Sequence, residues 1–335
     1  MYKIVLLIFF TTFSLWSLES KAVAQNDEWI LDRVNFYFED DVYTHTDDGY
    51  SAGERLSFLW YIPDENYTIY DTLFLDYGPS YSYFTFALTN QIFTPTDTNS
   101  KTLIENDRPY AGWSYAEFGM HKSSKKHLRS LLIKIGIIGS SSYSKEIQNN
   151  FHALIGNDYT KGWGNQLNNE IGVNLKYTHK WMLLSKSNTL FESSLVPFVE
   201  GELGNIAINA KGGVNTRIGY NIPKDFSVSS IDYGADPGIP AYDEYQNMKK
   251  LPWSFSLNFS AAASVVERDI FLDGNSFGKS HSVEKEPFIY YYGFGFTVRY
   301  KDFSFDFIEI RNSKRFITEK SNGHGVGTMV FTWLF

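Results

Sequence analysis

Residues 145 to 158, KEIQNNFHALIGND, contain a histidine placed so that it could do acid–base chemistry. His152 follows Gln148 by four residues and precedes Asp158 by six. Residues four apart on a helix share one face, so Gln148 and His152 would present their polar groups together. Histidine is the side chain best suited to take up a proton near neutral pH. A satisfied polar histidine in a surface loop is the alternative that this segment leaves open.

The same segment predicts a short amphipathic helix. Its apolar residues recur at helical spacing, at Ile147, Phe151, Leu154 and Ile155. Ser144 can serve as the N-cap, and Gly156 stands where a C-terminal cap glycine belongs. Such a helix has about three turns and cannot span a membrane. We expect its apolar stripe to lie against protein or lipid, leaving Gln148 and His152 to face a site.

A second polar group comes earlier in the chain, at Asp40 and Asp41. Strand alternation puts Asp41 in phase with the polar side, opposite the apolar residues Val34, Phe36 and Phe38. The same alternation groups Ser51 with Arg55 and Ser57 in a polar interior. Carboxylate ligands suit Ca²⁺, and no cysteine or paired-histidine spacing indicates zinc. A solvated turn is the alternative for the two aspartates.

The N-terminus indicates export. Residues 1 to 24 contain Lys3, an apolar stretch from Ile4 to Trp16 and the small-residue site Ala22-Val23-Ala24, which together are typical of a secretory signal. The chain has no cysteine, so an exported protein of this kind does without disulfides. Its net charge of -8 argues against a nucleic-acid partner.

Long alternating segments predict the fold. Residues 253–265 and 288–300 alternate apolar and small or polar side chains over more than ten positions. Strands of soluble sandwiches usually have about five or six residues, whereas a tilted crossing of an outer membrane needs about nine to eleven. Past the signal, no apolar run approaches the roughly 18 residues of a transmembrane helix. We therefore predict an all-β fold in which residues 25 to 335 form one transmembrane antiparallel β-barrel in the bacterial outer membrane.

About twelve strands are predicted, and an even number puts both termini on the periplasmic side. They lie near residues 32–39, 50–61, 80–93, 110–121, 128–139, 168–181, 189–202, 204–218, 252–266, 287–300, 302–312 and 325–335. The ending MVFTWLF resembles the terminal-strand signal of bacterial outer-membrane barrels. A phase slip between Phe307 and Ile308 predicts a β-bulge. Residues 219 to 251 would form a long periplasmic link, which either has its own structure or marks an error in the strand count.

Five motifs together resemble a known family. They are DDVY…DDGYSAG, DRPYAGW, QNNFHALIG, GWGNQLNNE and FLDGNSF. In this order on a barrel they are similar to the outer-membrane lipid A 3'-O-deacylases, over nearly the whole mature chain. The resemblance implies a site near the outer leaflet, between the barrel wall and a short extracellular helix. It also implies removal of ester-linked acyl chains from lipid A, the lipid anchor of lipopolysaccharide, with no protein partner.

The resemblance further implies roles for individual residues. A histidine activates water and a divalent cation stabilises the oxyanion. His152 and Gln148 match the family's catalytic histidine and its glutamine, and Asp158 stands where a glutamate is found. The family has an Asn-Asp pair at the positions of Asp40 and Asp41. Asp41 matches the aspartate, whereas Asp40 replaces the asparagine. Both are predicted cation ligands.

Other residues match the family's site less closely or have an open role. Ser51 replaces a threonine of the family site, and Lys101 is the nearest match to a substrate-binding lysine. Arg108 could reach a lipid A phosphate or pair with Asp107. Tyr110, Trp113 and Trp163 are predicted to be interfacial girdle aromatics rather than substrate contacts.

Two other functions stay open at this point. A passive porin or adhesin would explain the barrel and its aromatic residues, although not the Gln-His helix beside a pair of carboxylates. A serine-type outer-membrane phospholipase would also cleave lipid esters, with Ser51 as the candidate nucleophile.

Overall fold

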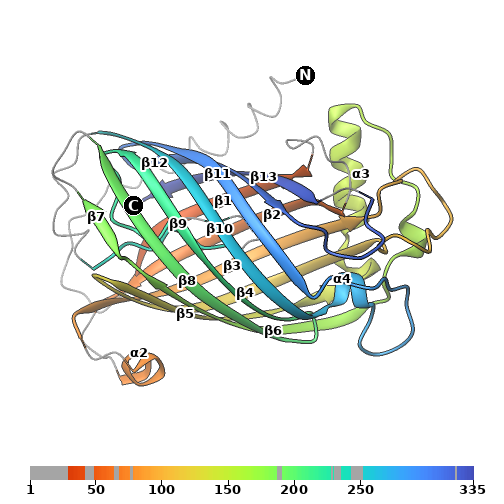
Figure 1. Ribbon diagram of the computed structural model, residues 1–335, viewed down its shortest axis with the longest axis horizontal. Helices are drawn as coiled ribbons and strands as arrows, with labels where there is room; N and C mark the ends of the chain where they lie inside the picture. The colour runs from red at the N-terminus through yellow and green to blue at the C-terminus, as the bar shows by residue number, and fades with distance from the viewer. Residues whose placement is uncertain are drawn as a thin grey trace.

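Twelve long antiparallel strands close into a barrel (Figure 1). The computed structural model describes residues 29–41, 49–63, 68–75, 78–186, 191–227, 229, 235–242, 252–320 and 323–335. The predicted signal segment, residues 1 to 24, lies outside this range. The strand bounds are Ile30–Asp40 (β1), Gly49–Ile62 (β2), Ser80–Thr94 (β3), Ala111–Ser124 (β4), His127–Ile138 (β5), Glu170–Trp181 (β6), Glu192–Gly204 (β8), Ala207–Tyr220 (β9), Trp253–Asp269 (β10), Phe288–Tyr300 (β11), Phe303–Asn312 (β12) and His324–Leu334 (β13).

Closure follows from the pairing of the end strands. Each long strand pairs with its neighbours in sequence, β1 pairs with β13, and β6 pairs with β8. A three-residue strand β7, Leu184–Lys186, adds to the edge of β8. The twelve predicted strands are thus confirmed, and the ring leaves no long strand with an open edge in lipid.

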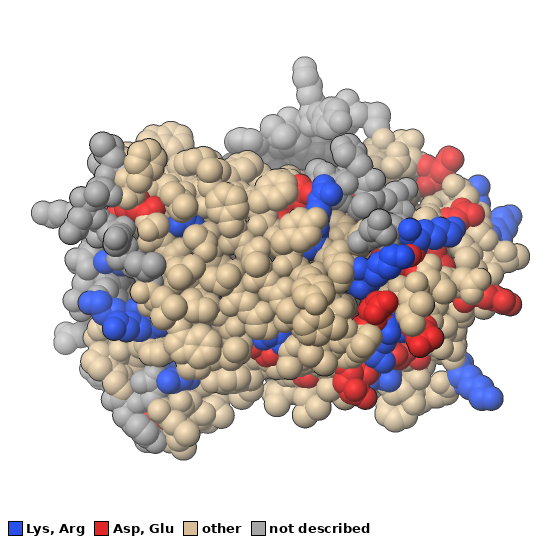
Figure 2. All heavy atoms as spheres, in the orientation of Figure 1, with Lys and Arg blue, Asp and Glu red and all other residues tan. Residues whose placement is uncertain are grey.

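The outer face of the barrel is apolar. Side chains at alternate positions, such as Leu88 of β3 and Phe118 of β4, are 51% and 40% exposed. Figure 2 shows few charged side chains over the middle of the strands and more of them toward the two ends. None of the helices in the described range has the length and apolar character to span a bilayer. An apolar band flanked by charge is the surface that an outer-membrane barrel presents to lipid.

The short helices lie at the two ends of the barrel (Figure 1). Helices α3 (Ser144–Ile155) and α4 (Ile270–Asp273) lie at one end, and α2 (Thr68–Phe74) lies at the other. The first strand, β1, begins at the α2 end and the last strand, β13, finishes there; in barrels with an even strand number this end is periplasmic. The α3 end is therefore the extracellular end.

The interior of the barrel is polar and densely paired. Its ion pairs join strands that are adjacent or one strand apart in the ring, at Arg55–Glu117, Lys134–Glu202 and Lys176–Glu200, with N–O distances of 2.6, 2.9 and 2.9 Å. Each charge in these pairs is buried together with its partner, which is the condition under which ions are tolerated away from water.

The long link after β9 has its own structure and lies inside the barrel. Two of its described parts, residues 223–227 and 235–242, form what we call the lumen segment. Arg33 of β1 donates to the carbonyl of Gly238 at 2.5 Å, and Lys180 of β6 pairs with Asp236 at 2.8 Å. Phe226 is fully buried in an apolar cluster with wall residues such as Leu59. The strand count therefore holds, and the segment fills the periplasmic half of the lumen.

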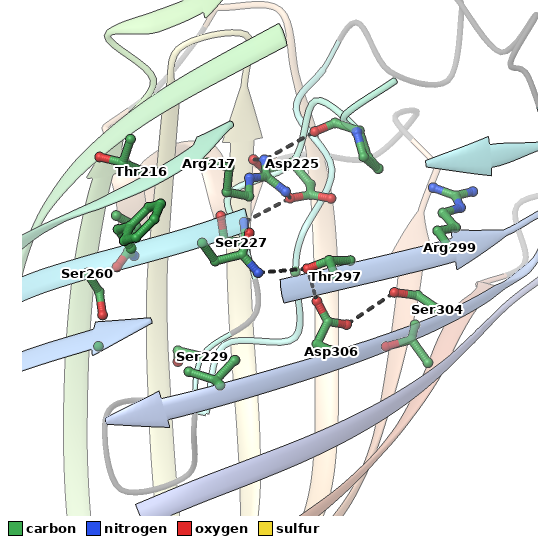
Figure 3. Close-up of a pocket in the computed structure, with 18 of the residues that line it drawn as sticks. Thr216, Arg217, Asp225, Ser227, Ser229, Ser260, Thr297, Arg299, Ser304 and Asp306 are labelled. Atoms are coloured by element: carbon green, nitrogen blue, oxygen red, sulfur yellow. Dashed lines mark hydrogen bonds and ion pairs between the residues drawn. The ribbon is translucent and has the colours of Figure 1, made fainter. Parts of the chain in front are cut away.

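A cavity of about 70 Å³, lined by polar and apolar side chains, remains between the lumen segment and the wall (Figure 3). Arg217 of β9 pairs there with Asp225 of the lumen segment at 2.7 Å. Asp306 of β12 accepts hydrogen bonds from Thr297 and Ser304. These groups satisfy one another, so the cavity is part of the polar packing of the interior.

An apolar layer crosses the extracellular half of the lumen. Phe271 of α4 stacks on Phe93 of β3 with ring centroids 3.8 Å apart, and Trp113, Ile138 and Val326 belong to the same buried cluster. A passive porin needs a water-filled lumen. Here the lumen segment occupies the periplasmic half of the lumen and the apolar layer occupies the extracellular half. This filled interior argues against a porin.

One sequence prediction about the strands, the bulge between Phe307 and Ile308, is wrong. The pairing of β12 with β11 and β13 runs without a register shift through Phe307 and Ile308, so no bulge lies there. Instead, Ile308 and Ile310 point into the lumen and join an apolar cluster with Phe198. Because apolar residues here face the lumen, the apolar positions of the sequence change from one face of the strand to the other, as they would at a bulge.

Candidate active site

Helix α3 runs from Ser144 to Ile155 and ends as predicted, with Gly156 in the left-handed conformation at φ 83°. Its start differs from the prediction. Tyr143, at φ 57°, is the N-cap, and Ser144 is the first helical residue. Ser144 is buried because its hydroxyl takes part in the contact that holds the helix on the barrel.

The first turn of α3 packs on the outer wall. Asn90 of β3 donates to the hydroxyls of Ser144 and Ser114, at 2.7 and 2.8 Å. Gly112 of β4 allows this approach, because a Cβ at that position would lie 2.2 Å from the Cβ of Ser144. Asn90, Gly112 and Ser114 alternate with lumen-facing residues such as Trp113, so the helix begins on the outside of β3 and β4.

From β4 the helix crosses toward β1. The ring of Phe151 contacts that of Phe38 of β1, with centroids 5.4 Å apart. Phe38 shares the outward face of β1 with Asp40, two residues further on. His152 directly follows Phe151, so the crossing of the helix brings it toward the extracellular end of β1. The rest of the apolar stripe, Ile147, Leu154 and Ile155, is 36 to 50% exposed and does not pack on the wall.

The ring of His152 is oriented by the backbone. Its Nδ1 lies 2.7 Å from the carbonyl oxygen of Asp158. A carbonyl oxygen can only accept, so Nδ1 carries the hydrogen, and Nε2 of the neutral ring is left as an acceptor. Asp158 thus contacts His152 through its main chain, while its side chain is exposed.

Gln148, one turn before His152, holds the following loop against the helix. It is only 6% exposed, and its Oε1 accepts from Thr160 Oγ1 and Trp163 Nε1, both at 3.0 Å. The loop fixed in this way includes Asp158, whose carbonyl orients His152. Gln148 therefore helps to position His152 indirectly, because it holds the loop whose carbonyl orients the ring.

Two carboxylates lie on the outward face beneath the end of α3. Asp40 of β1 is partly buried, and Glu54 of β2 is paired in register with Phe38. The two carboxylates are close enough to repel each other. One oxygen of Glu54, Oε2, is buried and accepts no hydrogen bond from the described part of the chain.

Sequence reasoning missed Glu54, although a signal was available. Asp40 interrupts the outward series Val34, Phe36, Phe38, and Glu54 interrupts the corresponding series of β2. A charged side chain on the lipid-facing side is costly in a barrel, so its presence on two neighbouring strands at one level indicates a function.

The donor set at this place fits a hard divalent cation. The set consists of Asp40 and Glu54 on the outward face and of Asp41, which follows β1 directly and is 2% exposed. These are oxygen donors, and the buried Oε2 of Glu54 still has coordinating capacity. Within the described ranges, no three His, Cys, Asp or Glu side chains are gathered closely enough to hold a metal by themselves. Backbone, water or substrate oxygens would have to complete the coordination.

Ser51 does not lie in the polar interior, contrary to the sequence prediction. The pairing of β2 with β3 shifts between Tyr50 and Ala52, so Ser51 is the extra residue of a bulge. Its hydroxyl is 2.5 Å from that of Thr94, which alternates with the lumen-facing Phe93. Ser51 therefore turns to the outer face, on the side where α3 lies.

The two predicted substrate-binding residues differ in position. Lys101 is exposed in the link between β3 and β4, and its carbonyl accepts from Asn165 in the loop after α3, at 3.0 Å. Arg108 is 2% exposed and lies 4.9 Å above the ring of Phe93. Burial lowers the pKa of Arg108, and nearby Asp269 counteracts this shift. The Asp107 carboxylate accepts from the backbone N–H groups of Arg108 and Thr96, at 2.8 and 2.9 Å, and in the described part of the chain no hydrogen bond joins it to the Arg108 guanidinium.

The three aromatic residues predicted for the membrane interface are buried, so that prediction is wrong. Tyr110, Trp113 and Trp163 are 3%, 3% and 2% exposed. Trp113 points into the lumen and stacks on Tyr115 at 4.0 Å, whereas Trp163 packs on Tyr110 at 5.0 Å beside the loop that Gln148 holds. These residues support the site instead of facing lipid.

Comparisons with known proteins agree with this architecture. The family model described as outer membrane protein LpxR matches residues 5–335. LpxR from Salmonella typhimurium has a similar structure, with a TM-score of 0.73 at 17% identity over 90% of this chain and 100% of that one. The β domain of the Bordetella autotransporter BrkA matches with a TM-score of 0.44 at 7% identity, over 91% and 98% of the two chains. No curated protein sequence matches the chain.

Proposed function

Because the chain belongs to the LpxR family of outer-membrane proteins, we propose that it hydrolyses the 3'-O-linked acyl esters of lipid A. The reaction uses a water molecule that His152 activates. The observation that carries the proposal is the orientation of His152. Its Nδ1–H is held by the carbonyl of Asp158, on a helix that lies against the outer wall above two lipid-facing carboxylates.

The proposed reaction is a single hydrolysis. Nε2 of His152 takes a proton from water as the water oxygen attacks the ester carbonyl carbon. The tetrahedral intermediate then breaks the bond between the acyl carbon and the sugar oxygen, and His152 returns the proton to that oxygen. A free fatty acid and a hydroxyl on lipid A result. The hydrogen bond from Nδ1–H to the Asp158 carbonyl keeps the ring in the required tautomer and orientation.

Asp41, with Asp40 and Glu54, would hold a Ca²⁺ ion. When bound, the ion supplies positive charge for the oxyanion of the intermediate. Asp40 and Glu54 otherwise repel each other on the lipid-facing side of the wall, so a cation would also relieve that repulsion.

Lys101 is the better placed of the two predicted substrate-binding residues to contact lipid A. Its side chain is exposed at the extracellular end, while its backbone is tied to the loop after α3. Arg108 would have to leave a buried position to make the same contact.

A serine nucleophile is the less supported alternative. Ser51 shares its hydrogen bond with Thr94, and His152 is held by Asp158. In the described part of the chain, Ser51 and His152 do not hydrogen-bond each other, although a serine mechanism requires that pair.

The test uses His152→Asn, because the Asn amide can still donate to the carbonyl of Asp158 but cannot act as a base. Lipid A from cells that express wild type or variant is compared by mass spectrometry. We expect the variant to insert normally and to lose roughly 10² to 10⁴-fold in rate, the range for a lost general base. Full deacylation by a folded His152→Asn protein would contradict the mechanism. Labelling of Ser51 by a fluorophosphonate would favour the serine alternative.

A further inference from the structure

Helix α2, in the link between β2 and β3, lies on the outside of the barrel wall. Asp71 of α2 forms an ion pair with Lys122 of β4. The neighbours of Lys122 on β4 face the lumen: Ser123 donates to the carbonyl of Pro240 in the lumen segment at 2.6 Å, and His121 bonds Ser130 of β5. Lys122 therefore faces outward, and the helix that pairs with it covers the outer face.

The outward positions under α2 are buried, unlike those elsewhere on the wall. Ser80, Ser82 and Lys122 are 4%, 0% and 3% exposed, whereas Phe118, further along the same face of β4, is 40% exposed. A lysine on the lipid-facing side needs a counter-charge, and Asp71 provides it. The ion pair and this burial fix α2 to the wall.

The strand register gives the depth of α2 in the membrane. Phe84 of β3 pairs with Trp60 of β2 and Met120 of β4, and its ring lies 5.1 Å from that of Trp29. Such outward aromatic residues near strand ends form the girdle at the membrane–water interface. Lys122 pairs with Ser82, two residues closer to the periplasm, a step of about 7 Å. Helix α2 thus lies at the level of the lipid headgroups.

One face of α2 is apolar and uncovered. Tyr70 and Phe74 are buried, at 8% and 6% exposure. Ile69 and Leu73 of this seven-residue helix are 65% and 43% exposed, and Leu75, which directly follows it, is 77% exposed. Three exposed aliphatic side chains on the outside of a membrane barrel are continuous with its lipid-facing surface.

We propose that α2 is an interfacial helix that inserts Ile69, Leu73 and Leu75 into the headgroup region of the periplasmic phospholipid leaflet. Amphipathic helices bind this zone with their apolar face buried by about 5–10 Å. The partner is the phospholipid leaflet itself, and the Asp71–Lys122 pair ties this contact to the barrel wall. The inference concerns the end of the barrel opposite α3 and does not depend on the proposed hydrolysis.

The chain contains no cysteine, so single-cysteine variants can be spin-labelled without background. Leu73→Cys and Ile69→Cys are compared with Leu88→Cys on the lipid-facing belt and with Glu105→Cys in an exposed extracellular link. Each labelled protein is placed in vesicles of phosphatidylethanolamine and phosphatidylglycerol. Power saturation then measures collisions with oxygen and with a water-soluble nickel chelate, and heat-modifiable migration confirms folding.

The α2 labels should collide with oxygen several-fold more, relative to the nickel chelate, than the Glu105 label does. They should approach the Leu88 label. Nickel accessibility equal to that of the Glu105 label would place the helix in water and overturn the proposal. Dipolar broadening between labels on neighbouring molecules would assign the apolar face to a second copy of the chain and would overturn it as well.

Discussion

Gly112→Ala should disable the site without unfolding the barrel. The added Cβ would lie 2.2 Å from the Cβ of Ser144, whereas ordinary contact begins at 3.4 Å. The difference of 1.2 Å has to be absorbed by the first turn of α3, because β4 is held by continuous pairing with β3 and β5. A misplacement of about 1 Å can cost about 10²-fold in rate, or about 2.7 kcal/mol of transition-state stabilisation. We therefore expect kcat/KM to fall by about two orders of magnitude.

The assay follows release of fatty acid from lipid A in detergent micelles, while heat-modifiable migration on gels reports the barrel. Gly164→Ala is the matched control. It changes a glycine in the loop that Gln148 holds, and no atom lies within 4 Å of the added Cβ. That variant should keep the wild-type rate. A Gly112→Ala protein with unchanged kcat/KM would refute the view that the contact of α3 with β4 sets the position of His152.

Three further changes test other parts of the structure. Asp158→Asn should alter kcat/KM by less than about threefold, because the carbonyl and not the carboxylate contacts His152; a large loss would show that the side chain takes part. Glu54→Gln should raise the Ca²⁺ concentration needed for half-maximal activity after chelation, whereas Glu105→Gln should not; an unchanged Ca²⁺ titration would remove Glu54 from the cation site. Deletion of residues 329–335 should abolish membrane assembly, because β1 and β12 would lose their partner over that range; normal heat-modifiable barrel would disprove this.

The fold could be predicted from the sequence because lipid imposes a simple rule. Every second residue of a spanning strand must be apolar, and this pattern is visible without any tertiary contact. Strand β10 follows the rule from Trp253 to Val265, and β11 follows it from Phe288 to Tyr300. The rule fails in β12, where Ile308 and Ile310 face a partly apolar lumen, and local alternation cannot tell that case from a bulge.

The site was only partly predictable, because some of its contacts are long-range. The spacing of Gln148 and His152 indicated a shared helix face, but nothing in the sequence indicates that a main-chain carbonyl orients the ring. Ser51 was assigned to the wrong face because it is itself the extra residue of a bulge in β2, and the inward–outward alternation of the strand is interrupted there. Glu54 could have been found by asking which outward positions carry charge.

The aromatic residues show a second limit. Tryptophan and tyrosine near strand ends are typical of membrane interfaces, and composition alone favours that location. Trp163 instead donates its indole N–H to Gln148 and Thr160, in a loop packed on the outside of the wall. The folding of the extracellular links decides which aromatic residues meet lipid, and that folding is a tertiary property.

The filled interior of the barrel has a consequence for the cell. The lumen segment and the layer around Phe93 and Phe271 occupy the space through which ions and small solutes would otherwise pass. In a planar bilayer, single copies should therefore be electrically silent. The outer membrane is a barrier to antibiotics and detergents, and each inserted copy would leave that barrier intact. The abundance of the protein can then rise without making the envelope leaky, which a water-filled barrel of the same circumference would not permit.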